Sequence, residues 1–492
     1  MTVTPTLERA SPIAPPSAPE AASTHVRGSG LGWIFTAFFG VFGWAIGLAK
    51  LTDNSFFWHL KTGEYILDHG IPHHDVFSYT APGAKWVAQS WLAEVTYAVL
   101  FRSMGGFGIR LLVGLVGAGI GMLTYRLALR LVRDRLVACG LTAAALAGIY
   151  TVWSERPLLL GVLFLLVLLW TVEVHDCFVG RHPMVVVPVL MWLWANSHGT
   201  YQLGFAYLGL HLLGRWIDGN PPWVGRERRL LFGALIAFAV VFVNPYGVGL
   251  VTFPIELLSR GEILSHIVEW KSPDFRQAWG VALGIWIVVY VVALSRGRHK
   301  VTRRDLIVTI PMLLLALWAV RNVAIAPLIC LPVVARAFAR DEEKPSELRG
   351  TMVAAAITVL VFAALVMGYQ ASTETNFDFS TYPVASMRYL ERHDLMGKHL
   401  LTTDAAAGYV ILEDWPKQKV FIDDRYDMYP TSVIYDYFDL TGAKPGSSKV
   451  LDKYDVDVII WGKDTSLASL LNQSDGWKRV HTDATDAVWV RN

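Results

Sequence analysis

Side chains that could carry out acid–base chemistry are concentrated directly after the first long apolar run of the chain. Asp53 opens the segment DNSFFWHL, in which aromatic residues follow the carboxylate closely. Desolvation at a membrane surface can raise the pKa of such a carboxyl group, which suits a general base. A solvated aspartate at a helix end is the alternative, and spacing by itself favours it.

The same segment continues through His59 to the triplet His73-His74-Asp75. These side chains can bind divalent cations, but adjacent residues rarely converge on one ion without a ligand from elsewhere. We therefore expect the histidines to hydrogen-bond lipid headgroups or backbone groups, and we assign no metal site. Asp75 is the better candidate for a second catalytic carboxylate beside Asp53.

Cationic side chains occur near other apolar runs. Lys61, Arg156, His198 and Arg321 could hold a phosphate or diphosphate at the membrane surface, which arginine binds in bidentate fashion. Arg321 precedes Asn322 and has apolar runs on both sides. The alternative is that these side chains extend to lipid headgroups. For Arg156 and Arg321 the sequence favours neither interpretation.

A further polar cluster, FIDDRYDMY at 421–429, follows a predicted strand near the end of the chain. Loops at the carboxyl ends of strands in open α/β sheets are common ligand sites. An Asp–Arg pair that stabilises a turn is the alternative interpretation, and it is slightly favoured.

The composition indicates what must position these residues. The chain has 492 residues, of which 53% are hydrophobic and 17% charged, whereas about 25% are charged in typical soluble domains. A net charge of +2, with no basic patch among aromatic residues, argues against nucleic-acid binding. The three cysteines lie in or near apolar segments and form no CxxC motif, so no disulfide framework is expected. The chain is predicted to be a polytopic membrane protein.

Apolar runs recur at the length of about 20 residues that a helix needs to cross a bilayer. About eleven spans are predicted, near 31–51, 106–125, 136–153, 157–174, 184–197, 201–217, 230–245, 279–295, 305–320, 323–338 and 351–369.

Arginine and lysine are concentrated after the second, sixth, eighth and tenth runs, and the positive-inside rule makes these connections cytoplasmic. The residues are Arg126, Arg130, Arg133, Arg135, Arg215, Arg226, Arg228, Arg229, Arg296, Arg298, Lys300, Arg303, Arg304, Arg336, Arg340, Lys344 and Arg349. The N-terminus is then cytoplasmic, and the polar connections between the other run ends share the opposite side.

Three regions follow from this pattern. Residues 1–30, rich in Pro, Ala and Ser, form a disordered cytoplasmic tail. Residues 31–370 form the transmembrane domain, whose first outer loop (52–105) contains an amphipathic interfacial segment at 91–104 with Trp91 and Tyr97 at headgroup depth. Residues 371–492 form a soluble extracytoplasmic α/β domain. It has helices near 383–396, 431–440, 447–453 and 464–472, strands at 399–403, 419–422 and 457–461, and a hairpin at 478–491.

The segment DNSFFWHLKTGEYILDHGIPHHDVFSYTAPGAKWVAQSWLAEV resembles the first outer loop of a bacterial family of GT-C-like membrane proteins. That family is similar to the glycosyltransferases that use polyprenyl-phosphate sugars. The resemblance continues through ERP at 155–157, WANSHG at 194–199, NPYG at 244–247, EWKSPDF at 269–275, RN at 321–322 and FIDDRYDMYP at 421–430.

The resemblance implies a mainly α GT-C-like bundle in the plasma (inner) membrane. Its implied activity is inverting transfer of a sugar from a lipid-phosphate donor to an unknown acceptor on the outer face, in the biosynthesis of an envelope polysaccharide or glycoprotein. Asp53 matches the family's general base, but Ser55 stands where an acid is frequent, which argues against a mechanism with two acids or a bridging metal. No cofactor is assigned, and a divalent metal stays an open alternative.

Under this hypothesis each polar residue has a role. Arg156, Arg321 and Lys61 would hold the lipid phosphate, with Asn322 beside Arg321. His59, Asn196 and His198 would orient the substrate, and the C-terminal domain would bind the acceptor.

Two rival functions remain. A lipid-linked saccharide transporter or flippase should show internal repeats and polar residues at mid-bilayer depth, and neither feature is evident. A non-catalytic assembly protein for envelope polysaccharide, with the fold but not the chemistry, is compatible with Ser55.

Overall fold

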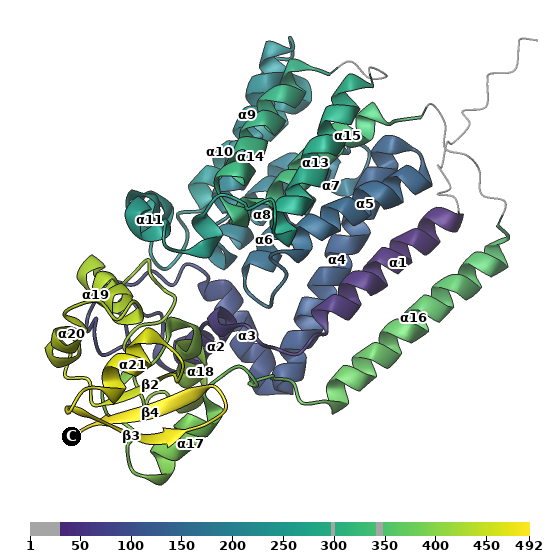
Figure 1. The fold of residues 1–492 in the computed structure, drawn as a ribbon. Helices are drawn as coiled ribbons and strands as arrows, with labels where there is room; N and C mark the ends of the chain where they lie inside the picture. Colours follow the sequence, from purple (N-terminus) through teal and green to yellow (C-terminus); the bar gives the residue numbers. More distant parts are fainter. Residues whose placement is uncertain (1–29, 297–300, 341–347) are drawn as a thin grey trace, which may run out of the picture.

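A computed structural model describes residues 30–296, 301–340 and 348–492. Residues 1–29 of the predicted cytoplasmic tail lie outside the described part, as do Arg298, Lys300 and Lys344 of the basic connections. The described chain is elongated, with the long apolar helices at one end and a sheet-containing C-terminal region at the other (Figure 1).

Each of the eleven apolar runs predicted from the sequence coincides with a helix. They are α1 (Gly30–Gly47), α4 (Gly106–Val132), α5 (Arg135–Tyr150), α6 (Leu158–Glu173), α8 (Pro183–Ser197), α9 (Tyr201–Ile217), α10 (Gly225–Val240), α13 (Ala278–Ser295), α14 (Arg303–Trp318), α15 (Ile325–Ala337) and α16 (Gly350–Thr373).

Among the described residues, five segments are long and apolar enough to cross a membrane: α1, α4, α13, α16, and α15 together with the turn before it. Helices α5, α6 and α8 are apolar but shorter. Eleven crossings therefore stay a prediction.

Local sequence explains where some of the helices begin. Asp134 accepts the backbone N–H groups of Leu136 and Val137 at the start of α5, and Thr302 and Asp305 form a capping box on α14.

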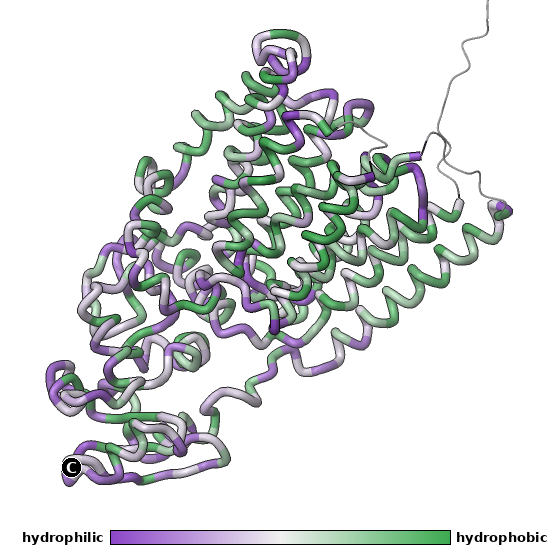
Figure 2. Tube along the Cα trace, turned by 45° about the horizontal axis from the view of Figure 1, so that its top comes forward, coloured by the Kyte–Doolittle hydropathy of each residue, from purple (hydrophilic) through white to green (hydrophobic). Residues whose placement is uncertain are grey.

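The outward surface of these helices is apolar. The side chains of Phe362 and Leu365 on α16 are 67% and 66% exposed, and Val288 on α13 is 62% exposed. In Figure 2 the long helices are hydrophobic along most of their length, and hydrophilic residues gather near their ends and over the C-terminal region. Large exposed apolar surfaces are unfavourable in water, so the outward surface of these helices is suited to contact with lipid.

Helices α1 and α4 pack through small residues. Gly43 and Gly47 on α1 face α4, on which Gly117 and Gly121 have the same four-residue spacing. A Cβ atom on Gly43 would lie 2.0 Å from the carbonyl oxygen of Gly117, and one on Gly121 would lie 2.1 Å from that of Phe39. Because lipid tails are as apolar as leucine, helices in a bilayer depend on such close backbone contact.

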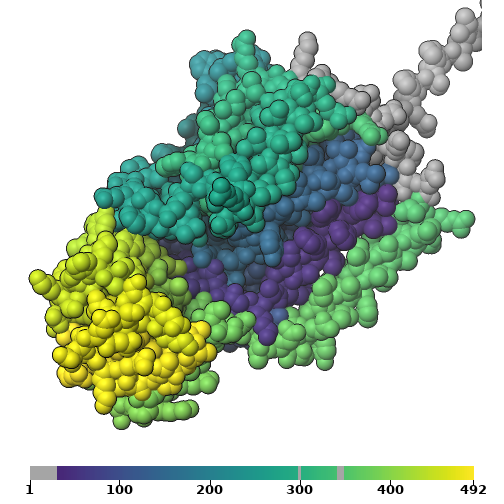
Figure 3. All heavy atoms as spheres, viewed as in Figure 1, coloured from purple at the N-terminus to yellow at the C-terminus, as the bar shows by residue number. Residues whose placement is uncertain are grey.

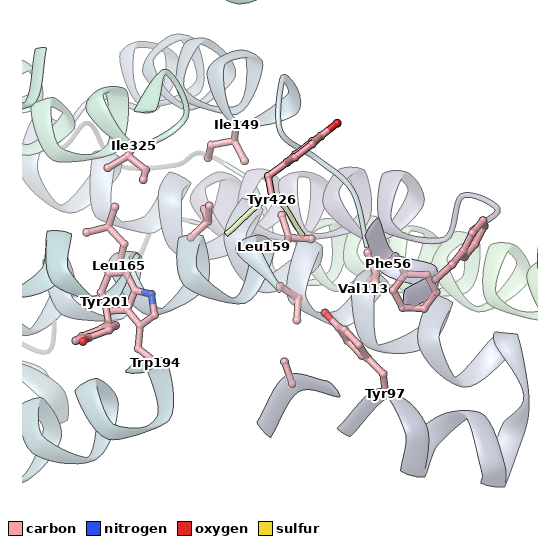
Figure 4. Packing of buried hydrophobic residues seen from close by; sticks show 14 of the residues in the cluster. Phe56, Tyr97, Val113, Ile149, Leu159, Leu165, Trp194, Tyr201, Ile325 and Tyr426 are labelled. Atoms are coloured by element: carbon pink, nitrogen blue, oxygen red, sulfur yellow. The ribbon is translucent and has the colours of Figure 1, made fainter. Parts of the chain in front are cut away.

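The segment predicted as the first outer loop (52–105), for which we keep that name, contains two helices, α2 (Asn54–His69) and α3 (Trp91–Met104). Helix α3 has the predicted bounds, whereas α2 was not predicted. The ring of Tyr97 does not face lipid, because it is buried against Phe56 of α2, at 5.4 Å between centroids, and its depth in the membrane stays a prediction. Figure 4 shows both residues within the packed interior. The amphipathic face of α3 is therefore covered by protein instead of lipid.

Shorter elements connect the remaining helices. They are α7 (Phe178–Arg181), α11 (Val248–Ser259), α12 (Gly261–Leu264), and the 3-10 turns η1 (Val268–Trp270) and η2 (Val320–Asn322).

The C-terminal region combines helices with one four-stranded sheet. Its helices are α17 (Val384–Arg392), α18 (Asp404–Asp414), α19 (Thr431–Thr441), α20 (Ser447–Lys453) and α21 (Ser466–Asn472), and its strands are β1 (Leu400–Leu401), β2 (Val458–Gly462), β3 (Trp477–Thr482) and β4 (Asp486–Arg491). The strand order is β1-β2-β4-β3, with β1 parallel to β2 and the other pairs antiparallel. The predicted hairpin is confirmed as β3–β4. The strand predicted at 419–422 is reduced to isolated bridges from Val420 to Ser78 and to Leu400, and α18 was not predicted.

The C-terminal region packs directly on the first outer loop, and the two form one continuous surface in Figure 3. The guanidinium of Arg425 is 1% exposed and pairs with Asp75 of the loop at 2.8 Å and with Asp423 at 2.6 Å. Asp75 also accepts hydrogen bonds from the backbone and hydroxyl groups of Ser78. A buried charge network therefore joins two segments that are about 350 residues apart in sequence.

The glycine contact predicts a steric effect on stability. Replacement Gly43→Ala forces a Cβ into the backbone of α4, and such overpacking costs about 1–3 kcal/mol of unfolding free energy. Gly140→Ala on α5 is the matched control, because its Cβ would meet no atom within 4 Å. The melting temperature of the full chain in detergent should fall for Gly43→Ala alone. Equal melting temperatures for the two variants would contradict this packing.

The buried pair predicts a second effect. Asp75→Asn removes one partner of Arg425, which should cost about 3 kcal/mol, at the low end for a broken buried pair because Asp423 remains. Asp68→Asn breaks the exposed ion pair with Arg102 and should have no measurable effect. Melting temperature and protease cleavage after residue 371 would be measured in the full chain. Unchanged cleavage in Asp75→Asn would show that the pair does not hold the C-terminal region in place.

Candidate functional site

Polar residues from several connections surround one cavity of about 150 Å³ at the junction of the helices with the C-terminal region. A cavity of this size is smaller than most small-molecule sites, so it could enclose only part of a lipid-linked sugar. Its lining residues are Ser55, Trp58, His59, Trp86, Val87, Ala88, Gln89, Ser90, Glu94, Arg156, Pro157, Leu158, His198, Glu269, Arg321, Asp424, Arg425 and Asp427.

Asp53 borders this cavity through an ion pair. Its side chain caps α2 by accepting the backbone N–H of Phe56 at 3.1 Å. Both of its carboxylate oxygens lie 2.8 Å from Nε of Arg156, which is part of the cavity wall. Glu155 supports the turn by accepting the backbone N–H groups of Thr52 and Asp53. Asp53 is therefore close to the cavity but already bound to a cation.

Three arginines line the cavity. The pairs of Arg425 are described above, and the other two, Arg156 and Arg321, differ in their partners. Arg156 is neutralised on two sides, by Asp53 and by Glu269, whose Oε1 lies 2.7 Å from Nη1. Arg321 lies with its guanidinium over the ring of Trp270, 4.5 Å from the centroid. Within the described residues no carboxylate pairs with Arg321 and no hydrogen bond to its side chain is formed. A cation of this kind can accept an anionic ligand without losing a partner.

His198 lies beside both arginines. The backbone N–H of Thr200 donates to its Nδ1 at 3.2 Å, so a neutral ring carries its proton on Nε2. Burial, together with the charges of Arg321 and Arg156, lowers the pKa of His198 to about 3. His198 is therefore a neutral hydrogen-bond donor at physiological pH.

His59 is buried and its Nδ1 lies 2.7 Å from Oε1 of Glu94. Burial lowers the pKa of His59 and raises the pKa of Glu94 well above its usual value. Burial therefore disfavours the charged form of both side chains. Both residues line the cavity.

Asp424 also lines this cavity. It belongs to the polar cluster at 421–429, in which the sequence assigned no role to a single acid. The hydroxyl of Ser55 and the indole Nε1 of Trp58, the latter at 2.5 Å, both donate to its carboxylate. Burial, opposed by Arg156, raises the pKa of Asp424 to about 7. The sequence contained one indication of this residue, the two adjacent acids in FIDDRYDMY. Asp423 pairs with Arg425, whereas Asp424 lines the cavity.

Two buried polar atoms of the cavity-lining residues have no protein partner. They are Nη1 of Arg425 and Oε2 of Glu94. Both residues are 1% exposed, and an unpartnered buried polar atom is costly. A hydroxyl group, which donates and accepts at once, would satisfy a donor and an acceptor of this kind.

Five of the residues predicted to act on substrate lie outside the cavity lining. One is Asp53, which borders the cavity through Arg156, and the other four are held elsewhere by protein contacts. Asp75 binds Arg425 behind the wall, and Lys61 pairs with Glu64 on the same helix at 3.2 Å. Asn196 is buried, where Trp91 donates to its Oδ1, and Asn322 donates to the carbonyl of Leu315. These contacts hold helices and loops in place. Their roles toward substrate remain sequence-based predictions.

The described residues contain no group of three or more His, Cys, Asp or Glu side chains arranged to hold a metal ion. Residues His73 and His74 in particular are not within such a group. Next to Asp53 the structure has an arginine, so the positive charge that a metal would supply there is already provided by the protein.

No protein-family model matches the sequence, and no curated protein sequence matches it. The structure is similar to the oligosaccharyltransferase of Archaeoglobus fulgidus with a tethered acceptor peptide, with a TM-score of 0.52 and 11% identity over 87% of this chain and 69% of that one. It is also similar to oligosaccharyltransferase AglB of the same archaeon in complex with an inhibitory peptide and a dolichol-phosphate, with a TM-score of 0.50 and 11% identity over 94% and 74% of the two chains.

The mycobacterial arabinofuranosyltransferase AftD matches with a TM-score of 0.49 and 12% identity, over 93% of this chain and 41% of that one. The two oligosaccharyltransferases are glycosyltransferases of the GT-C fold. The chain described here therefore has a GT-C-like fold built on apolar helices.

Proposed function

We propose that the protein is a membrane glycosyltransferase that moves a sugar from a lipid-phosphate donor to an acceptor hydroxyl, with inversion at the anomeric carbon. The observation that carries this proposal is the cavity whose wall combines Arg156, the carboxylate of Asp424 and Arg321, which forms no ion pair among the described residues. The similar oligosaccharyltransferase that was solved with a dolichol-phosphate supports the choice of donor class.

Arg156 and Arg321 would bind the phosphate of the donor. As the bond between the anomeric carbon and the phosphate oxygen breaks, negative charge develops on the leaving phosphate. Two fixed guanidinium groups in a partly dehydrated cavity stabilise that charge. The neutral His198 can donate a further hydrogen bond to the same oxygens.

The sugar ring would occupy the part of the cavity lined by Trp58, Trp86, Glu94 and Arg425. Its hydroxyl groups could satisfy the unpartnered Nη1 of Arg425 and Oε2 of Glu94. Trp58 and Trp86 supply apolar ring surface, which suits the C–H faces of a sugar.

Catalysis also needs a group that removes the proton of the acceptor hydroxyl. Two carboxylates near Arg156 can do this, Asp53 from the first outer loop and Asp424 from the C-terminal region. We place this chemistry on the extracytoplasmic face, with residues 371–492 on that side, because the arginine-rich connections are at the other ends of the helices.

The donor site can be tested by binding. Arg321→Ala should weaken the affinity for undecaprenyl phosphate about tenfold or more, because a charge-assisted hydrogen bond contributes about 1.5–3 kcal/mol. Binding would be measured by native mass spectrometry on the full chain in nanodiscs. Arg102→Ala removes an exposed cation that pairs with Asp68 and should bind like the wild type.

A deletion strain of the source organism supplies the cellular test. It should accumulate a sugar linked to a lipid phosphate, and the gene for the wild-type chain should restore the normal level. Equal affinity of Arg321→Ala and wild type, or no change in the lipid-linked sugars of the deletion strain, would count against the proposal.

A further inference from the structure

The geometry points to Asp424 of the C-terminal region as the general base, and to Asp53 as a positioning residue that holds Arg156. This inference rests on the proposed glycosyl transfer and assigns a role within that site. It differs from the expectation drawn from the sequence, in which Asp53 is the base.

The contacts of Asp53 are poor for proton transfer. Both of its oxygens lie 2.8 Å from Nε of Arg156, and Oδ1 also accepts the backbone N–H of Phe56. Protonation of Asp53 would weaken the ion pair that fixes Arg156 at the moment when Arg156 must stabilise the leaving phosphate. The same contacts are well suited to a residue that orients a cation.

The contacts of Asp424 leave one oxygen available. The hydroxyl of Ser55 and, at 3.3 Å, Nδ2 of Asn54 donate to Oδ2. Within the described part of the chain, Oδ1 accepts one hydrogen bond, from Nε1 of Trp58, and a carboxylate oxygen can accept two. The second lone pair of Oδ1 is therefore free for the acceptor hydroxyl, and Asp424 belongs to the cavity wall, whereas Asp53 does not.

The surroundings of Asp424 also favour a base that works near neutrality. Burial raises its pKa to about 7, and the best catalytic pKa lies near the operating pH. The charged and titratable groups around it are Asp53, Arg156, Tyr382, Asp423 and Tyr426. The positive charge of Arg156 opposes this increase in the pKa of Asp424, and the negative charges of Asp423 and Asp53 add to it.

In the proposed step, the acceptor O–H bond breaks and its proton passes to Oδ1 of Asp424. The acceptor oxygen forms a bond to the anomeric carbon, while the bond from that carbon to the phosphate oxygen breaks. The lipid phosphate leaves with the electron pair, held by Arg156 and Arg321, and Asp424 later returns its proton to solvent.

One structural consequence is that the C-terminal region completes the active site. Asp424 reaches the cavity because Asn54 contacts two parts of this region: it donates to the carbonyl of Asp404 and accepts the backbone N–H of Gly408. A chain that ends before residue 371 would keep Arg156 and Arg321 but would have no base.

The test uses membranes of the deletion strain that contain each full-length variant at equal abundance, with the accumulated lipid-linked sugar radiolabelled in vivo. The rate at which label leaves the solvent-extractable lipid is measured from pH 5.5 to 8.5. For the wild type this rate should rise with pH through a midpoint near 7, because only ionised Asp424 accepts the proton.

Asp424→Asn should lower the rate by about 10²–10⁴-fold and remove this rise with pH. It should still bind undecaprenyl phosphate in nanodiscs, which shows that the variant is folded. Asp424→Glu should regain part of the activity with a shifted midpoint.

Asp53→Asn should keep the rise with pH but lower the rate at every pH, because Arg156 loses one of its two carboxylate partners and is oriented less precisely. Asp68→Asn, which removes a carboxylate outside the cavity from an exposed ion pair with Arg102, is the control and should also keep the rise with pH. If Asp424→Asn keeps the rise, or Asp53→Asn loses it, the assignment of the base is overturned while the proposed function stands. If the wild type neither discharges label nor binds undecaprenyl phosphate, the proposed function is overturned, and this inference with it.

Discussion

The arrangement of the candidate site depends on one buried cation, the guanidinium of Arg425. A charge that is removed from water must be paired, and Arg425 finds its partners in two segments, Asp75 of the first outer loop and Asp423 of the C-terminal region. Its ring neighbours, Trp86 at 4.4 Å among them, exclude water from the pair. Once these segments are held together, Asp424 has little freedom and meets the donors at the start of α2.

The need to pair buried charges also distinguishes two other arginines of the cavity wall, Arg156 and Arg321. Arg156 has acids on both sides, Asp53 and Glu269, and so links the first outer loop to two later connections. Among the described residues Arg321 forms no ion pair, and its guanidinium lies over the face of Trp270, with Glu269 acting on it only at longer range. One arginine is therefore held in position by the protein itself, and the other is left with its hydrogen-bonding groups open to a ligand. Two cations of similar chemistry thus have different uses.

The membrane helices position these connections by packing at both ends. Helices α6, α14 and α15 have the cavity near one end, and at the other end a second network joins Glu173 to Arg304 and Arg336, with Asp305 between the two arginines. Ion pairs at the far ends and backbone contact between α1 and α4 leave little room for the helices to slide. A site built from several loops needs such rigid support, because small displacements reduce catalysis strongly.

The sequence by itself determined where the long helices lie and which polar residues are candidates for a site. Apolar runs of bilayer length predict helices reliably, since the hydrogen-bonding requirement of a buried backbone allows few alternatives, and all eleven runs are helical. The sequence also identified Arg156, His198 and Arg321 as candidates, because polar residues at the ends of apolar runs are uncommon and are usually functional.

Only the tertiary structure decided which of those residues meet. The sequence placed Asp53 and Asp75 together as candidate acids, yet Asp75 lies behind the cavity wall with Arg425, and Asp424 occupies the cavity instead. Ser55, at the position where an acid was expected, is the residue whose hydroxyl donates to Asp424. Pairing of buried charges operates between side chains hundreds of residues apart, and local periodicity contains no information about such distant contacts.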